Sequence, residues 1–222
     1  MPFFRNGNVR SSKVNHALQR IPAYLLLREL IRDPAAIGAI CSSSTSLANR
    51  MAAWVDPAQE GWVIELGGGT GAITAALLRH GVAVDRLIVI EKSKRLARHL
   101  RARFPGIHIL QGDAADIGTI TKGDVAAVVS GLPLRSMPPD AVSRVTTACA
   151  TTLGAKGRLI QFTYWPRPPS PWLSAGLIQA ASDMVWRNLP PARVEVFTHS
   201  NNNLASGAQT GAAGPGQADR AG

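Results

Sequence analysis

Three glycines at alternate positions, Gly67, Gly69 and Gly71, form the centre of the residues that could do chemistry in this sequence. They directly follow an apolar run at residues 62–66 that contains one acid, Glu65. A strand that ends in a glycine turn and leads into a helix lets the backbone approach a nucleotide-type ligand, because no Cβ blocks the way. The lysine and hydroxyl pair of a phosphate-binding loop does not follow Gly71. The spacing therefore predicts a nucleotide-cofactor site at the end of a buried strand.

Two more acids stand where the next two predicted strands end. Residues 86–90 form an apolar run that is followed by Glu91, and residues 107–111 lead to Asp113 and Ala114. A carboxylate at such a strand end can accept two hydrogen bonds from a ribose diol. The alternative for Glu91 is a solvated acid that binds no ligand. We favour the ligand role because the glycine cluster lies one strand upstream.

Metal ligands and nucleophilic side chains are sparse in this sequence. It has 2 cysteines and 5 histidines, and none of them stand at a spacing typical of a metal site. We therefore expect no metal, and we expect free thiols in a reducing compartment.

The charge balance of the chain favours an anionic partner. The 222 residues include 24 Lys and Arg against 14 Asp and Glu, which gives a formal net charge of +10. Such an excess suits a nucleic acid or an acidic membrane surface, and it also suits solubility alone. No apolar run of about 18 residues and no signal peptide occur, so we expect a cytoplasmic protein without a membrane span.

The elements that must position these residues follow from the apolar periodicity. Strands are predicted at residues 62–66, 86–90, 107–111, 124–129, 157–163, 184–188 and 194–198. Helices are predicted at residues 47–55, 72–80, 92–103, 141–153 and 172–181, the first of them capped by the preceding Ser/Thr run. Strands that alternate with helices predict an α/β, Rossmann-like fold. Its seven-stranded sheet should be mostly parallel, with helices on both faces and an antiparallel pair at the end of the chain.

The chain divides into three parts by composition. Residues 1–35 are basic, and within them residues 24–32 fit an amphipathic helix with arginines beside its apolar stripe. That helix can lie in a membrane interface or pack on the domain that follows, and the pattern favours neither. Residues 36–198 hold the α/β domain. Residues 199–222 cannot bury enough apolar area to offset the entropy of ordering, so we expect a disordered tail.

The glycine cluster in its context, ELGGGTG, resembles motif I of the class I S-adenosylmethionine (SAM) methyltransferases. The resemblance covers roughly residues 20 to 170 and includes IGAICSSSTSLANRM, IEKS, QGDA, VVSGLPL and IQFTY. Over this stretch the chain resembles the bacterial phospholipid N-methyltransferases, which convert phosphatidylethanolamine stepwise to phosphatidylcholine. The resemblance implies a SAM-dependent N-methyltransferase with the fold predicted above.

The segment SGLPL distinguishes this family from the related rRNA adenine dimethylases. In those enzymes the corresponding motif is typically NLPY, and its aromatic ring stacks on the base. Here Ser130 occupies the first position, and Leu134 stands where the aromatic residue belongs. Because the stacking platform is absent, methylation of an aminolipid is the favoured interpretation and nucleic-acid adenine methylation the alternative. Another aminolipid, such as an ornithine lipid, or a small amine is a third possibility.

The resemblance implies a role for each candidate site residue. SAM would be bound by residues at the ends of the first four strands, namely Glu65, Gly67, Gly69, Gly71, Glu91, Asp113, Ala114 and Ser130. The acceptor would be bound by the SGLP segment and the end of the fifth strand, namely Gly131, Leu132, Pro133, Tyr164 and Arg167. Tyr164 and Ser130 would be the catalytic residues, and Arg167 would pair with the lipid phosphate. Two general bases remain open: Tyr164, acting through a bound water molecule, and bulk water itself.

The resemblance also gives the basic N-terminal segment a role. Members of this family are soluble and reach the membrane through such a helix. It therefore implies that residues 24–32 recruit the protein to anionic lipids, peripherally on the cytoplasmic side of the inner membrane.

Overall fold

A computed structural model describes residues 37–121, 123–164, 169–188 and 191–200 of the chain. The predicted N-terminal amphipathic helix, Arg167 and nearly all of the predicted tail lie outside these residues. Within the described residues no helix is long and apolar enough to cross a bilayer.

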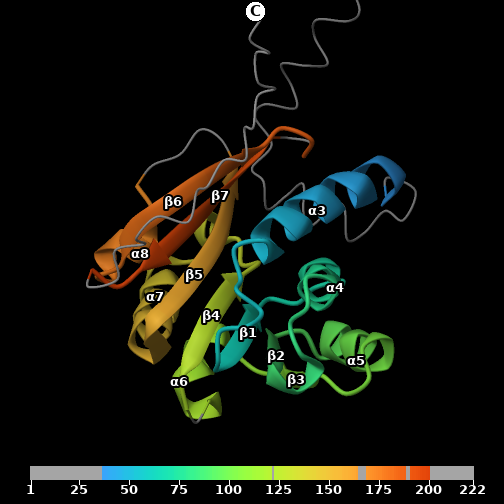
Figure 1. The fold of residues 1–222 in the computed structure, drawn as a ribbon, viewed down its shortest axis with the longest axis horizontal. Coiled ribbons are helices and arrows are strands. Elements are labelled where there is room, and N and C mark those ends of the chain that lie inside the picture. The colour runs from blue at the N-terminus through green and yellow to red at the C-terminus, as the bar shows by residue number, and fades with distance from the viewer. Residues whose placement is uncertain (1–36, 122, 165–168, 189–190, 201–222) are drawn as a thin grey trace, which may run out of the picture.

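The core of the protein is one seven-stranded sheet with the order β3-β2-β1-β4-β5-β7-β6 (Figure 1). The strands are β1 (Trp62–Leu66), β2 (Leu87–Glu91), β3 (His108–Gln111), β4 (Val125–Ser130), β5 (Leu153–Tyr164), β6 (Ile178–Val185) and β7 (Ala192–Thr198). Strands β1 to β5 are parallel, and β7 is antiparallel to both β5 and β6. The strand order reverses between β1 and β4, which is where an open parallel sheet forms its ligand crevice. The predicted seven-stranded, mostly parallel sheet is confirmed, but its strand predicted at residues 184–188 spans residues 178–185, and residues 186–188 form a turn.

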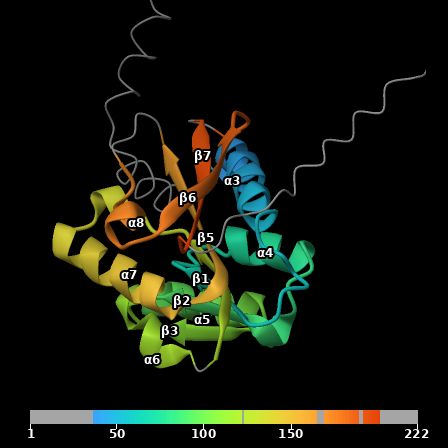
Figure 2. The ribbon, with the colours of Figure 1, turned by 60° about the vertical axis from the view of Figure 1, so that its left-hand side comes forward.

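Helices cover both faces of this sheet (Figures 1 and 2). One face carries α3 (Ile37–Ala52), α4 (Ala72–Arg79) and α5 (Lys94–Arg103), and the other carries α6 (Ile117–Ile120), α7 (Pro139–Thr152) and α8 (Pro171–Ser174). Short 3-10 turns lie at Val84–Arg86 (η2), Ala114–Asp116 (η3) and Leu134–Ser136 (η4). Successive strand residues alternate between the two faces, so β1 places Val63 in the α3–α5 core and Ile64 in the α6–α8 core.

The predicted helix at residues 172–181 is wrong. Helix α8 is a single turn that ends at Ser174, and Gly176 then adopts a left-handed φ of 87°. From residue 178 the chain forms β6, which pairs with β7 over its whole length. The hydrogen bonds of this non-local ladder outweigh the local preference for a helix, which is the only preference that periodicity detects.

The first helix of the domain is longer than predicted. Helix α3 begins at Ile37, so the Ser/Thr run at residues 42–46 lies inside the helix and does not cap it. Its C-terminal half packs Leu47, Ala48 and Met51 into the core beside α4. The burial of this apolar stripe accounts for a helix that continues through residues of modest helix propensity.

Candidate functional site

The residues singled out in the sequence gather at one edge of the sheet. Gly67 follows β1, Glu91 ends β2, Asp113 follows β3, Ser130 ends β4 and Tyr164 ends β5. Because the carboxyl ends of parallel strands share one edge, all five lie on the rim above the point where the strand order reverses.

The glycine loop has two kinds of glycine. Gly67, Gly69 and Gly71 all have positive φ, at 75°, 53° and 85°. A Cβ on Gly71 would lie 2.4 Å from Cε2 of Phe104, so this glycine is required for packing on α5. A Cβ on Gly69 would meet nothing closer than a backbone oxygen at 3.8 Å. The loop is therefore open at Gly69, where a ligand can approach the backbone.

Glu91 holds the glycine loop in place. Its Oε2 accepts a hydrogen bond from the amide of Gly69 at 2.9 Å, and its Oε1 accepts one from the amide of Ser93 at 2.7 Å. The residue is buried, so the alternative of a solvated acid does not fit the structure. Each carboxylate oxygen keeps a second lone pair, which leaves Glu91 able to accept hydrogen bonds from a diol beside Gly69.

Glu65 is a fully buried acid with a free oxygen. Thr74 of α4 donates a hydrogen bond to its Oε2 at 2.6 Å, while Oε1 has no partner. Burial raises the pKa of Glu65 to about 8, the Thr74 hydrogen bonds oppose that rise, and the charge of nearby Glu91 adds to it. Thr74 was not singled out in the sequence, because nothing local indicates a partner nine residues away. A buried carboxyl with one unpaired oxygen suits a cationic donor group.

Asp113 is fixed at the end of β3 by two partners. Its Oδ1 accepts from the amide of Ala115 at 3.1 Å, and its Oδ2 forms an ion pair with Nζ of Lys92 at 2.9 Å. The backbone hydrogen bond and Lys92 lower its pKa, so the carboxylate stays ionised at neutral pH. Ala114 is buried and packs in the α6–α8 core.

The segment after β4 lies directly against the glycine loop. The amide of Gly131 donates to the carbonyl of Leu66 at 2.8 Å, and a Cβ on Gly67 would lie 2.9 Å from Cδ2 of Leu132. Ser130 is buried, and its Oγ accepts from the amide of Leu132 at 3.4 Å. The predicted cofactor loop and the predicted acceptor segment, which ends at Pro133, are therefore in contact.

Gln161 of β5 supports this segment and was missed by the sequence analysis. The Nε2 of Gln161 donates to the carbonyl oxygen of Leu132 at 3.2 Å and to the carbonyl oxygen of the next residue, Phe162, at 2.8 Å. It is paired in register with Ser130, a relation that only the sheet reveals.

The two predicted catalytic side chains leave the sheet on opposite faces. Ser130 is in register with Leu66 of the α6–α8 core, so its side chain lies on that face. Tyr164 packs on the α3–α5 core, with its ring 5.5 Å from that of Phe162. Its hydroxyl hydrogen-bonds to the Asn188 side chain, and burial raises its pKa. The structure does not bring the two hydroxyl groups together.

Comparison with known proteins shows which family the domain with this edge is similar to. A family profile described as "Methyltransferase domain" matches residues 63–157. An ornithine lipid N-methyltransferase of Singulisphaera acidiphila is 30% identical over 181 residues, which cover 76% of this chain and 92% of that protein. The ribosomal RNA small subunit methyltransferase A of Methylococcus capsulatus is 29% identical over 127 residues, 55% of this chain and 44% of that protein.

The fold also recurs among solved structures. The magnesium protoporphyrin IX methyltransferase of Synechocystis, determined with bound SAM, superposes with a TM-score of 0.58 at 14% identity. The superposition covers 88% of this chain and all of that one. At this identity the likeness concerns the fold alone.

Proposed function

The chain belongs to the class I SAM-dependent methyltransferases, and we propose that it transfers methyl groups to the amine of a membrane lipid. The similarity to an ornithine lipid N-methyltransferase supports an aminolipid, because it extends over 92% of that protein, beyond the cofactor-binding strands. The similarity to the rRNA enzyme covers 44% of that protein.

The observation that carries this proposal is the position of Leu134. It stands where an rRNA adenine dimethylase has its base-stacking aromatic residue. Here Leu134 is buried in the α6–α8 core with Trp172. It presents no flat surface at the rim, so a base would lack the stacking that such enzymes use. An alkyl amine needs no stacking platform, and the SGLP segment is adequate for it.

The residues of this edge fit SAM. Glu65 offers an unpaired oxygen to a cationic amino group, Glu91 offers lone pairs to a ribose diol, and Gly69 leaves room beside it. Asp113, ionised and fixed by Lys92, would accept a hydrogen bond from the adenine amino group. SAM supplies a methyl group already activated by its sulfonium, so the protein contributes position and exclusion of water.

The acceptor amine must reach the segment that touches the glycine loop. We assign its binding to the backbone of Gly131, Leu132 and Pro133, with the Ser130 hydroxyl behind them. An unperturbed alkyl amine has a pKa of about 10.4, so it must lose a proton before it attacks the methyl carbon. Burial raises the pKa of Tyr164, so its hydroxyl stays protonated at neutral pH and serves better as a contact for the amine than as its proton acceptor.

The proposed acceptor is phosphatidylethanolamine, with an ornithine lipid as the alternative. Arg167 would pair with the phosphate of the former. The protein would work peripherally at the cytoplasmic face of the inner membrane, and the net charge of +10 would draw it to anionic lipid. Methylation of rRNA is the second candidate, since the same positive charge suits nucleic acid.

Transfer of a radiolabelled methyl group from SAM tests the proposal. Vesicles that contain phosphatidylethanolamine, vesicles that contain an ornithine lipid, and ribosomal RNA would be offered in parallel. We expect label in a lipid fraction, and the two vesicle types identify the headgroup. Label in the RNA alone would overturn the proposal. A Glu91→Ala protein serves as the control without cofactor binding.

A further inference from the structure

The turn between β6 and β7 exposes a large aromatic side chain at the edge of the sheet that carries the site. Trp186 is 74% exposed, whereas the other large exposed hydrophobic residues of the described chain are at most 44% exposed. Val185 pairs with Ala192, which pairs in turn with Tyr164 at the end of β5. The turn that follows Val185 therefore projects from the same edge as the glycine loop.

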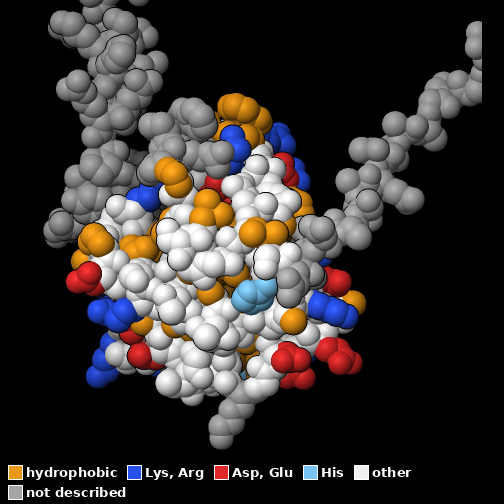
Figure 3. Space-filling view, turned by 90° about the vertical axis from the view of Figure 1, so that its left-hand side faces the viewer, with side chains coloured by type: hydrophobic (Ala, Val, Ile, Leu, Met, Phe, Trp, Pro, Cys, Tyr) orange, Lys and Arg blue, Asp and Glu red, His pale blue; other side chains and the backbone are white. Residues whose placement is uncertain are grey.

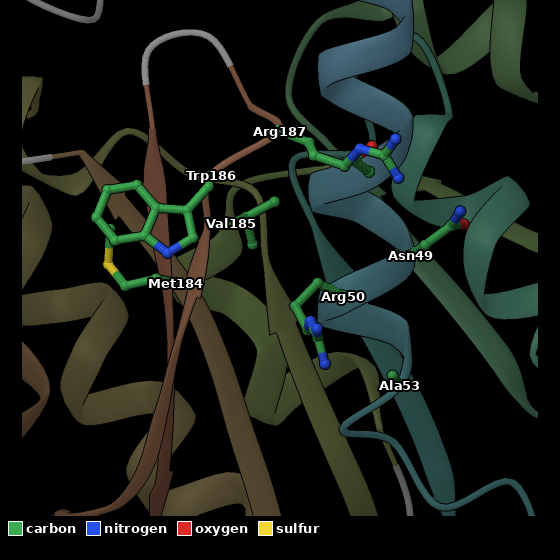
Figure 4. Close-up of a pocket in the computed structure, with 8 residues that line it drawn as sticks. Asn49, Arg50, Ala53, Met184, Val185, Trp186 and Arg187 are labelled. Atoms are coloured by element: carbon green, nitrogen blue, oxygen red, sulfur yellow. The ribbon is translucent and has the colours of Figure 1, made fainter.

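A cavity of about 460 Å³ separates this turn from α3. Its lining comes from both sides, with Asn49 and Arg50 on α3 and Val185, Trp186 and Arg187 at the end of β6 and in the turn. In Figure 4, Val185 and Arg187 point from the end of β6 toward α3, whereas Trp186 points away from α3. The turn thus presents an aromatic ring on its outer side and a guanidinium group over the cavity.

The surface around the cavity is positively charged. Arg50 forms an ion pair with Asp183 at 3.1 Å, and Arg79 of α4 donates to the side chain of Asn49 at 2.8 Å. Arg187 is exposed and has no ion-pair partner among the described residues. The cavity is therefore lined by two guanidinium groups, those of Arg50 and Arg187, and only the former has an ion-pair partner among the described residues. Figure 3 shows hydrophobic and basic side chains, with acidic ones among them, at the upper end of the face it presents, the end at which β6 finishes in Figure 1.

We propose that Trp186, Arg187 and Arg50 form a docking surface for a membrane that contains anionic phospholipids. Tryptophan favours the membrane interface because its ring is apolar and its N–H stays hydrated. Arginine beside it pairs with lipid phosphates. Docking here turns the carboxyl edge of the sheet toward the lipid, so that a headgroup reaches the segment after β4 without leaving the bilayer. The purpose of this docking rests on the proposed function, whereas the affinity for lipid rests on the exposed Trp186 and the arginines near it.

Binding of the full-length protein to vesicles tests the surface directly. Vesicles of phosphatidylglycerol and phosphatidylcholine would be compared with vesicles of phosphatidylcholine alone. We expect Trp186→Ala to weaken binding to the anionic vesicles about ten-fold, and Arg187→Gln about five-fold. The matched controls are Ile178→Ala, at the opposite end of the same strand and 39% exposed, and Arg98→Gln on α5, which should bind as the wild type does. Equal binding by Trp186→Ala and wild type would overturn the proposal.

Quenching by brominated acyl chains locates the contact even if the N-terminal segment also binds lipid. The fluorescence of the wild type minus that of Trp186→Phe isolates Trp186. We expect this difference to be quenched by anionic brominated vesicles, and an unquenched difference would contradict docking through the turn.

Methyl transfer to a water-soluble, short-chain aminolipid separates the two proposals. Trp186→Ala should retain the wild-type rate there if the turn serves docking alone, and a wild type inactive on every aminolipid would remove the proposed function while leaving the vesicle result intact.

Discussion

Titration of Glu65 should make the protein less stable as the pH rises through neutrality. The folded-state pKa of this buried carboxyl is about 8, against an ordinary value of 4.5. Between these two pKa values the folded state holds a proton that the unfolded chain has released. The stability that depends on this proton is complete below a pH of about 4.5 and is lost as the pH rises through about 8.

The size of the effect follows from the pKa difference. One pKa unit corresponds to about 1.4 kcal/mol, so between pH values of about 6 and 8 the free energy of unfolding should fall by about 2 kcal/mol through this group. For a chain of this length that fall lowers Tm by roughly 5 °C. In Glu65→Gln the amide oxygen can still accept from Thr74, but the side chain cannot ionise.

The assay is thermal unfolding of the wild type and of Glu65→Gln, without SAM, across this pH range. Other titrating groups are common to both proteins, so the difference in Tm isolates Glu65. We expect the wild type to lose Tm relative to the variant as the pH rises. Parallel Tm profiles, or a wild type that gains Tm relative to the variant, would refute a protonated buried Glu65. Saturating SAM should reduce the difference, because its cationic amino group favours the ionised carboxyl.

Three further predictions concern the rim. Gly71→Ala should lower the free energy of unfolding by about 2–4 kcal/mol, because a Cβ there meets Phe104 at a positive φ. Gly176→Ala has the same backbone strain, but its Cβ would contact nothing, so it should lower the free energy of unfolding by about 1 kcal/mol. Equal losses of unfolding free energy in the two variants, measured with denaturant, would contradict the packing argument. Glu91→Ala should lose SAM binding in calorimetry, because the variant lacks both the partner of the Gly69 amide and the acceptor for the ribose diol. Unchanged affinity would contradict the assignment of Glu91. Tyr164→Phe should lower kcat/KM for the lipid about ten-fold at unchanged SAM affinity, whereas unchanged turnover would limit the hydroxyl to its bond with the β6–β7 turn.

The local pattern of the sequence was enough to predict the frame of the site. Continuous apolar runs predicted the strands at 62–66 and 86–90 to within a residue, because each strand is buried on both faces of the sheet. The glycine spacing predicted the turn, since three positive φ values within five residues are strained in any other residue. The acids at Glu91 and Asp113 then reach one rim by the rule that parallel strands share their carboxyl edge.

Relations between distant residues could not be predicted in this way. The partner of Glu65 lies on the next helix, and the support of Leu132 by Gln161 depends on the register of β4 with β5. The separation of Ser130 and Tyr164 onto opposite faces likewise follows from the strand register. The first half of strand β6 was predicted as a helix, because the apolar pattern of residues 178–181 does not show the ladder that they form with β7.

The most direct test of the central claim is a competition between lipid and RNA acceptors in one reaction. Purified full-length protein would be incubated with bacterial membranes, ribosomes and SAM that carries a deuterated methyl group, and lipids and RNA would then be analysed by mass spectrometry. We predict deuterated methyl groups on the amine of a membrane lipid, and Glu91→Ala should abolish them. Deuterium confined to adenine bases of ribosomal RNA would contradict the account, because the buried Leu134 would then have failed to exclude a base.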